Sequence, residues 1–104
     1  MAKLPDERIQ ELLGDRPGWT RKDAKWLVKK YRFPQFMKGI EFVQQTAMTA
    51  EALNHHPMIA IEYKVVTISV TSWSEGGITP LDFELIDRCD RLYNAMCGGG
   101  DSSS

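Results

Sequence analysis

Both histidines of the chain stand side by side, in the stretch EALNHHPMIAIEY at residues 51–63. An imidazole has an unperturbed pKa of about 6.5, so it gives and takes protons near neutral pH more readily than other side chains. The pair His55 and His56 therefore indicates proton transfer or metal binding. A zinc site takes three or four protein ligands, and neighbours in an extended segment point to opposite faces, so we expect no metal at this pair.

A structural interpretation of the same pair stays open. His55 and His56 come just before Pro57, and proline disfavours helical geometry for the residue ahead of it, so a helix should end here. Imidazoles at a helix end interact favourably with the last carbonyls and with the negative end of the helix dipole. Nucleophilic catalysis is disfavoured, because no Ser or Cys lies in a recognisable nucleophile motif. From these residues alone, the pair either does acid/base chemistry or caps a helix.

The elements that must position the histidines follow from the apolar periodicity of the chain. Patterns of period two and period 3.6, with their caps and turns, indicate alternating strands and helices. The predicted order is a helix over 5–13 closed by Gly14, strands over 19–21 and 25–33, a helix over 35–54, strands over 58–63 and 65–71, and a helix that opens at 79–82.

The two longer helices have recognisable apolar stripes. In the helix over 35–54 the stripe consists of Phe36, Ile40, Val43, Ala47, Ala50 and Leu53. The last helix opens with Thr79 as N-cap, Pro80 at the first position and Asp82 at the third, an order typical of helix starts. Asp82 therefore has a structural explanation besides any role at a site. The stripe expected on this helix is Leu81, Leu85, Cys89, Leu92 and Met96.

The fold class follows from this order. Strands joined by short turns are antiparallel, so we expect an α+β fold: a four-stranded antiparallel sheet with three helices packed on one face, in the order α-β-β-α-β-β-α. Val66, Ile68 and Val70 should face the core. One sheet face and at least one edge strand stay open, which favours self-association. Residues 1–97 are expected to form a single domain, and the tail GGGDSSS at 98–104 is expected to be mobile. The hairpin aromatics expected to pack in the core or an interface are Trp19, Trp26, Tyr31 and Phe33.

The composition is that of an ordinary globular domain, with 42% apolar residues, 26% charged residues and a net charge of −1. This charge favours neither a nucleic acid nor a membrane partner. No signal peptide is recognisable, and no apolar run approaches the roughly 20 residues of a membrane span, so we expect a cytoplasmic protein. Cys89 and Cys97 match no metal or redox spacing and are expected to be reduced. A local basic run is interpreted as a solvated face, or as a guide for an anionic ligand or partner; it consists of Arg21, Lys22, Lys25, Lys29, Lys30 and Arg32.

The stretch around the histidines resembles the signature of the pterin-4a-carbinolamine dehydratases, a family also known as dimerization cofactors of a homeodomain transcription factor. The likeness spans residues 5–95, and the family's element order is the one read above. The matching residues are Glu51, His55-His56-Pro57, Tyr63 and Asp82, together with Gly18-Trp19, the pair Phe33 and Phe36, and GGIT at 76–79.

The resemblance implies an enzyme, a hydro-lyase. It would remove water from 4a-hydroxytetrahydropterin, the 4a-carbinolamine, to give the quinonoid dihydropterin in pterin recycling, with no metal or organic cofactor. His55 would be the leading general acid/base, and His56 would hold the pterin through a ring hydrogen bond. Glu51 would orient His55, contact the pterin, or be an exposed residue without a role. Pro57 and Asp82 are also implied at the substrate site.

One position departs from the family pattern, which usually has a third histidine where Trp73 stands. An indole nitrogen only donates a hydrogen bond, so Trp73 cannot act as a base; it would stack on the pterin or close the pocket. This departure supports a second hypothesis, a catalytically weak or inactive member that acts as a protein-binding coactivator or assembly factor. The resemblance further implies a homodimer or homotetramer built from sheet edges and helix faces.

Overall fold

The computed structural model of the protein describes residues 2–97. The tail at 98–104, for which mobility is predicted, lies outside the described residues, as does Met1. The elements in chain order are α1 (Asp6–Gly14), β1 (Thr20–Lys22), β2 (Trp26–Arg32), α2 (Phe36–Leu53), β3 (Met58–Glu62), β4 (Val65–Val70), the 3₁₀ helix η1 (Trp73–Glu75) and α3 (Pro80–Cys97). The predicted α+β fold and its element order are confirmed. Within residues 2–97, none of the helices is long and apolar enough to cross a membrane.

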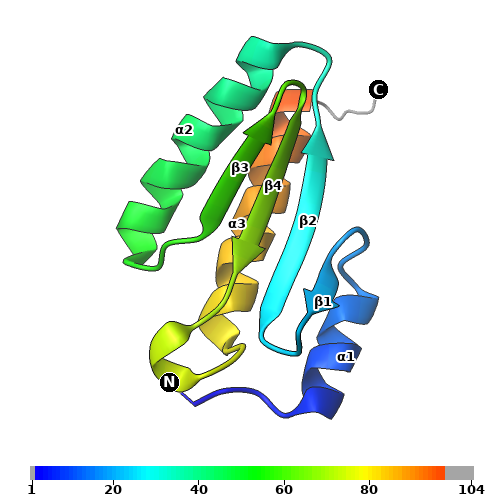
Figure 1. Ribbon diagram of the computed structural model, residues 1–104, viewed down its shortest axis with the longest axis vertical. Helices are drawn as coiled ribbons and strands as arrows, with labels where there is room; N and C mark the ends of the chain where they lie inside the picture. Colours follow the sequence, from blue (N-terminus) through cyan, green and yellow to red (C-terminus); the bar gives the residue numbers. More distant parts are fainter. Residues whose placement is uncertain (1, 98–104) are drawn as a thin grey trace.

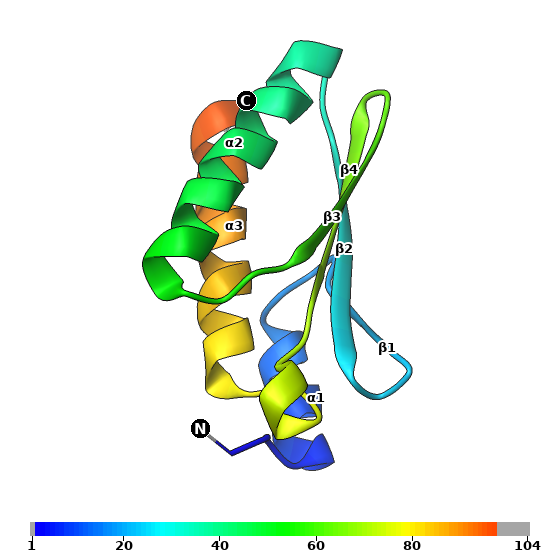
Figure 2. The same ribbon diagram turned by 60° about the vertical axis from the view of Figure 1, so that its left-hand side comes forward.

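The sheet is a single antiparallel layer with the strand order β1-β2-β4-β3. β2 and β4 form its centre, and β1 and β3 are its edges. Figure 2 shows α2 and α3 together on one side of the sheet, and Figure 1 shows α1 beside β1 at one end. No helix of the described chain covers the opposite side of the sheet. One open face and two edge strands therefore remain, as the sequence predicts.

Strand alternation decides which residues enter the core. Val66, Ile68 and Val70 on β4 are buried as predicted, and Leu27 and Tyr31 on β2 face the same side. Burying an apolar side chain of this size contributes about 1.5–3 kcal/mol. The hairpin aromatics buried in the same cluster are Trp19, Tyr31 and Phe33. This cluster holds the sheet against the helices.

The buried face of α2 differs from the predicted one. The buried residues of this helix are Gly39, Phe42, Thr46 and Ala50. Phe36 and Ala47, which belong to the predicted stripe, are exposed. The physical reason lies at Gly39, where an added Cβ would stand 3.3 Å from Cγ2 of Val66. A glycine lets the helix backbone approach the sheet closely, so α2 turns the face centred on Gly39 inward.

The buried stripe of α3 is wider than predicted. Leu85 and Cys89 are buried as predicted, and Phe83 and Ile86 are buried in addition. The other predicted members are half-buried, namely Leu81, Leu92 and Met96. A helix in contact with both the sheet and α2 has to bury a broad face. Both cysteines are free, and burial raises the pKa of the Cys89 thiol to about 12, so this thiol stays protonated.

One carboxylate fastens the β1–β2 hairpin to α3. Asp90 accepts hydrogen bonds from Trp19 Nε1 at 3.1 Å, Lys29 Nζ at 2.9 Å and the Tyr31 hydroxyl at 2.5 Å. The Lys29 ammonium also lies 4.8 Å from the centre of the Tyr31 ring. The interpretation of the basic run as a solvated face is therefore wrong for Lys29. Burial and the neighbouring Asp90 raise the pKa of Tyr31 well above its ordinary value, so its hydroxyl keeps the proton that it donates.

We expect Asp90→Ala to lower the free energy of unfolding by about 2–4 kcal/mol, because three donors lose a charged acceptor. Urea denaturation of the purified protein measures this difference. The matched control is Glu84→Ala on the same helix, which removes an exposed ion pair with Arg88 and should change stability by about 0.5 kcal/mol or less. Equal losses in the two variants would contradict the role given to Asp90.

Candidate active site

The histidine pair follows the C-terminal end of α2. The helix ends at Leu53, and Asn54 adopts left-handed geometry with φ 51° and ψ 44°. The backbone N–H groups of Asn54 and His55 donate to the carbonyls of Glu51 and Ala50. These backbone hydrogen bonds satisfy carbonyls in the last turn of the helix, as is common where the residue after a helix is left-handed. The imidazoles contact carboxylates rather than these carbonyls, so the capping interpretation of the pair is wrong.

His55 is directed toward the start of α3. Its Nε2 lies 2.5 Å from Oδ1 of Asp82. The Asp82 side chain is fully buried, and that of His55 is 14% exposed. A carboxylate in its ionised form only accepts hydrogen bonds, so we expect Nε2 to be the donor in this contact. Asp82 therefore holds one ring nitrogen of His55, and Nδ1 is not part of this contact.

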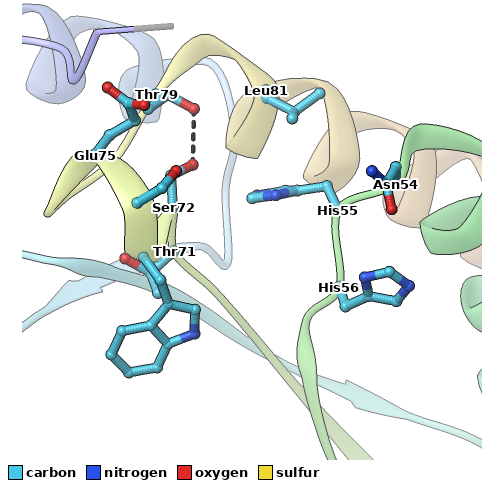
Figure 3. A pocket seen from close by; sticks show the side chains of 10 residues that line it. Asn54, His55, His56, Thr71, Ser72, Glu75, Thr79 and Leu81 are labelled. Atoms are coloured by element: carbon cyan, nitrogen blue, oxygen red, sulfur yellow. Dashed lines mark hydrogen bonds between the residues drawn. The ribbon is translucent and has the colours of Figure 1, made fainter.

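The second oxygen of Asp82 is held by the segment ahead of α3. Oδ2 accepts hydrogen bonds from Ser72 Oγ and from the backbone N–H of Thr79, both at 2.8 Å. Ser72 Oγ and Thr79 Oγ1 lie 2.9 Å apart, the contact drawn in Figure 3. The bond from Thr79 agrees with the predicted helix start, because an acidic residue at the third helix position commonly accepts from the N-cap N–H. Asp82 consequently serves the helix start and the histidine together.

His56 points the other way. In Figure 3 the His55 ring extends toward Ser72, whereas the His56 ring turns away from it. Nε2 of His56 lies 2.5 Å from Oε2 of Glu51, and these two side chains are 56% and 76% exposed. Glu51 orients His56 and not His55, which overturns the first option left open for this glutamate. Exposed ion pairs contribute little stability, so the fold does not depend on this contact.

A pocket of about 370 Å³ opens between the histidines and the segment that joins β4 to α3. It is lined by Asn54, His55, His56, Thr71, Ser72, Trp73, Ser74, Glu75, Thr79 and Leu81. Of the predicted site residues, both histidines and Trp73 line the pocket, and Asp82 lies behind His55. Glu51 and Pro57 are outside the lining. Within residues 2–97, no three His, Cys, Asp or Glu side chains come together in a group that could hold a metal ion.

Ser72 is a site residue that the sequence prediction missed. It is buried, and its backbone N–H donates to the carbonyl of Gly77 at 3.0 Å in an isolated antiparallel bridge. A signal for it was present, because Ser72 continues the alternation of buried residues that ends with Val70. A polar side chain on the core face needs a hydrogen-bond partner, and here the partner is Asp82.

Trp73 stands on η1 at the rim of the pocket and is 75% exposed. Its ring packs edge-on against Trp26, with centroids 5.1 Å apart and planes at 84°. Trp26 is half-buried and does not belong to the core cluster, so it packs against Trp73 and not in the core. Trp73 therefore lines the histidine pocket and contacts Trp26.

Comparison with known proteins identifies a family that contains this arrangement of elements. The family model described as pterin 4 alpha carbinolamine dehydratase matches residues 2–92. A relative from Roseiflexus sp. (strain RS-1), provisionally named a pterin-4-alpha-carbinolamine dehydratase, is 41% identical over 91 residues, which cover 88% of this chain and 97% of the relative. A relative from Herpetosiphon aurantiacus with the same provisional name is 42% identical over 95 residues, which cover 91% and 98%.

Two solved structures are similar to this one. The crystal structure of a transcriptional coactivator/pterin dehydratase from Brucella melitensis superposes with a TM-score of 0.83 at 27% identity, covering 88% of this chain and 98% of that one. A pterin dehydratase-like protein identified as a RuBisCO assembly factor in the alpha-carboxysome gives a TM-score of 0.64 at 19% identity, covering 75% and 92%. At the lower identity the likeness shows the fold alone.

We expect His55 to hold its proton on Nε2 at alkaline pH, because Asp82 accepts from that nitrogen. Long-range proton–nitrogen correlation spectra of the imidazoles distinguish the two tautomers. Asp82→Ala should abolish this fixed preference, whereas the control Glu51→Gln should change the signals of His56 and leave those of His55 in place. A native His55 protonated on Nδ1 would contradict the geometry described here.

Proposed function

The chain belongs to the pterin 4 alpha carbinolamine dehydratase family, and from this premise we propose that it removes water from a 4a-hydroxytetrahydropterin to give the quinonoid dihydropterin. The main support is the hydrogen bond between His55 and the buried Asp82 at the wall of a pocket. Small-molecule sites commonly measure about 300–1,000 Å³, so the pocket of about 370 Å³ suits a compact bicyclic ring. Such an activity would serve pterin recycling.

The reaction requires two proton movements on neighbouring atoms. The bond between C4a and its hydroxyl oxygen breaks, and the hydroxyl leaves as water with the proton that it receives. The adjacent ring nitrogen loses its proton, and its electron pair forms the new double bond to C4a. The net change is the loss of one water molecule without oxidation or reduction, so we propose that no metal or organic cofactor takes part.

His55 is proposed as the general acid/base of this dehydration. Its Nδ1 would take the proton from the ring nitrogen or deliver one to the leaving hydroxyl. Asp82, with Oδ1 at 2.5 Å from Nε2, holds the ring in the orientation that this proton transfer needs. Ser72 and Thr79 act through Asp82 as positioning residues.

The remaining predicted residues are proposed to hold the substrate. His56 would donate or accept a ring hydrogen bond, with Glu51 setting its orientation. Trp73 would lie against the flat ring at the pocket rim, where an exposed indole offers an apolar surface. Pro57 would contribute by fixing the chain direction after His56. We also propose that the protein is a homodimer or homotetramer, because β1 and β3 are open edges.

The second candidate function is a protein-binding coactivator or assembly factor without full activity. The observation in its favour is Trp73, an exposed indole at a position where a proton-transferring side chain is usual in the family. The Brucella melitensis structure, described as both a transcriptional coactivator and a pterin dehydratase, shows that the two descriptions are applied to one relative. Measured dehydration separates the two functions for this chain.

We expect the protein to accelerate dehydration of freshly generated 4a-hydroxytetrahydropterin, and His55→Ala to lower that acceleration about a hundred- to ten-thousand-fold, the usual contribution of a positioned acid/base group. Ultraviolet absorbance follows the reaction against the spontaneous rate. Glu84→Gln, on the exposed side of α3, serves as the matched control with unchanged rate. A full rate in His55→Ala, or no acceleration by the native protein, would refute the enzymatic proposal.

A second expectation concerns the two 4a epimers of the substrate. One acid/base group reaches one face of a flat ring, so the native protein should dehydrate one epimer faster than the other. Trp73→His should accelerate the slower epimer, because Trp73 lines the same pocket as His55 and a histidine there could transfer a proton. Trp73→Phe, which keeps an aromatic ring without titratable nitrogen, should give no such gain. Equal rates for both epimers with the native protein would contradict this expectation.

A further inference from the structure

A second hollow lies on the open face of the sheet, next to the candidate active site. It measures about 230 Å³ and is lined by Lys22, Asp23, Trp26, Val28, Met58 and Ser69. The strand register explains how these residues meet, since Val28 pairs with Ser69, Ser69 pairs with Met58, and Lys22 pairs with Trp26. Paired residues of antiparallel strands point to the same side of a sheet, and this side is the one without helices.

The two hollows adjoin along the Trp26–Trp73 pair. Trp73 lines the first and Trp26 lines the second, and their ring centroids are 5.1 Å apart. The stretch 56–58 also borders both hollows, because His56 lines the first and Met58 lines the second. A ligand that fills the first pocket can therefore extend across the indoles into the second without leaving the protein surface.

The chemistry of this path is suited to a flat apolar group. Trp73 at the first hollow and Met58 at the second are 75% and 60% exposed, and exposed large apolar side chains commonly mark a binding surface. Aromatic rings at right angles present a face and an edge, and both pack well against a further ring. At the far rim, the Lys22 ammonium offers hydrogen-bond donors beside Asp23, which suits an accepting polar end such as a carboxylate on the Lys22 side.

We propose that this second hollow is a subsite for the ring substituent of the pterin, and that it favours substrates whose substituent is an aryl group with a polar end over substrates with a short alkyl chain. The inference rests on the proposed function, because it takes the pterin ring to occupy the pocket beside His55. In this proposal the Trp26–Trp73 pair determines the substrate preference, and the histidines carry out the dehydration.

Calorimetric binding of two stable dihydropterins tests the proposal without requiring turnover. The probes are 6-methyl-7,8-dihydropterin, whose ring carries a single methyl group, and 7,8-dihydropteroate, whose substituent is an aryl group that ends in a carboxylate. The native protein should bind the aryl compound about tenfold more tightly, the usual effect of one additional aromatic contact. Trp26→Ala should bring the affinity ratio close to one.

Two further variants make the outcome decisive. Met58→Glu changes an exposed residue of the subsite and should also reduce the ratio, and Met48→Ala on α2, an equally exposed methionine at 60%, should keep it. Equal affinity of the native protein for both probes would overturn the subsite and leave the proposed function standing. An undiminished ratio in both Trp26→Ala and Met58→Glu would overturn it too. Failure of the native protein to bind either probe would overturn the proposed function and the subsite together.

Discussion

The structure around the candidate site depends on one fully buried carboxylate. A buried charge is strongly unfavourable unless hydrogen-bond donors surround it, and Asp82 obtains its donors from three separate segments. His55 follows α2, Ser72 follows β4, and Thr79 precedes α3. A displacement of any of these segments would remove a hydrogen-bond partner from Asp82. The need to satisfy this carboxylate therefore fixes the walls of the pocket relative to one another.

The scaffold holds α3 against the sheet at two places along its length. Near the start of the helix, Asp82 joins it to the loops, and two turns later Asp90 joins it to the β1–β2 hairpin through Trp19, Lys29 and Tyr31. Between these anchors the broad apolar face of α3 contacts the sheet and α2. The helix thereby keeps its position and its rotation, and both are needed if Oδ1 of Asp82 is to stay within hydrogen-bond distance of His55.

Local patterns in the sequence predict much of this fold, and the failures have tertiary causes. The alternation on β4 and the cap at Thr79 depend on near neighbours, and both are confirmed. The rotation of α2 depends on how closely Gly39 approaches β4, which no pattern of apolar residues within the helix can reveal.

The suggested pairing of Glu51 with His55 is wrong for a related reason. Glu51 and His55 are four residues apart, a helical spacing that would let them meet. Asn54 leaves the helix in left-handed geometry between them, so this spacing loses its meaning and Glu51 meets His56 instead. Asp82, which does meet His55, comes from another element 27 residues away.

The double duty of Asp82 bears on how this family can change over evolutionary time. A lineage that abandons catalysis still needs an acid to close the start of α3 and to satisfy Ser72, so selection for a folded protein would retain Asp82 after its chemical use had ended. The fold does not depend on His56 and Glu51 in the same way, since both side chains are largely in solvent. In relatives that have lost the proposed activity, we expect substitutions at Glu51 and His56 before substitutions at Asp82. The presence of Asp82 alone would therefore indicate a folded domain and not an active one.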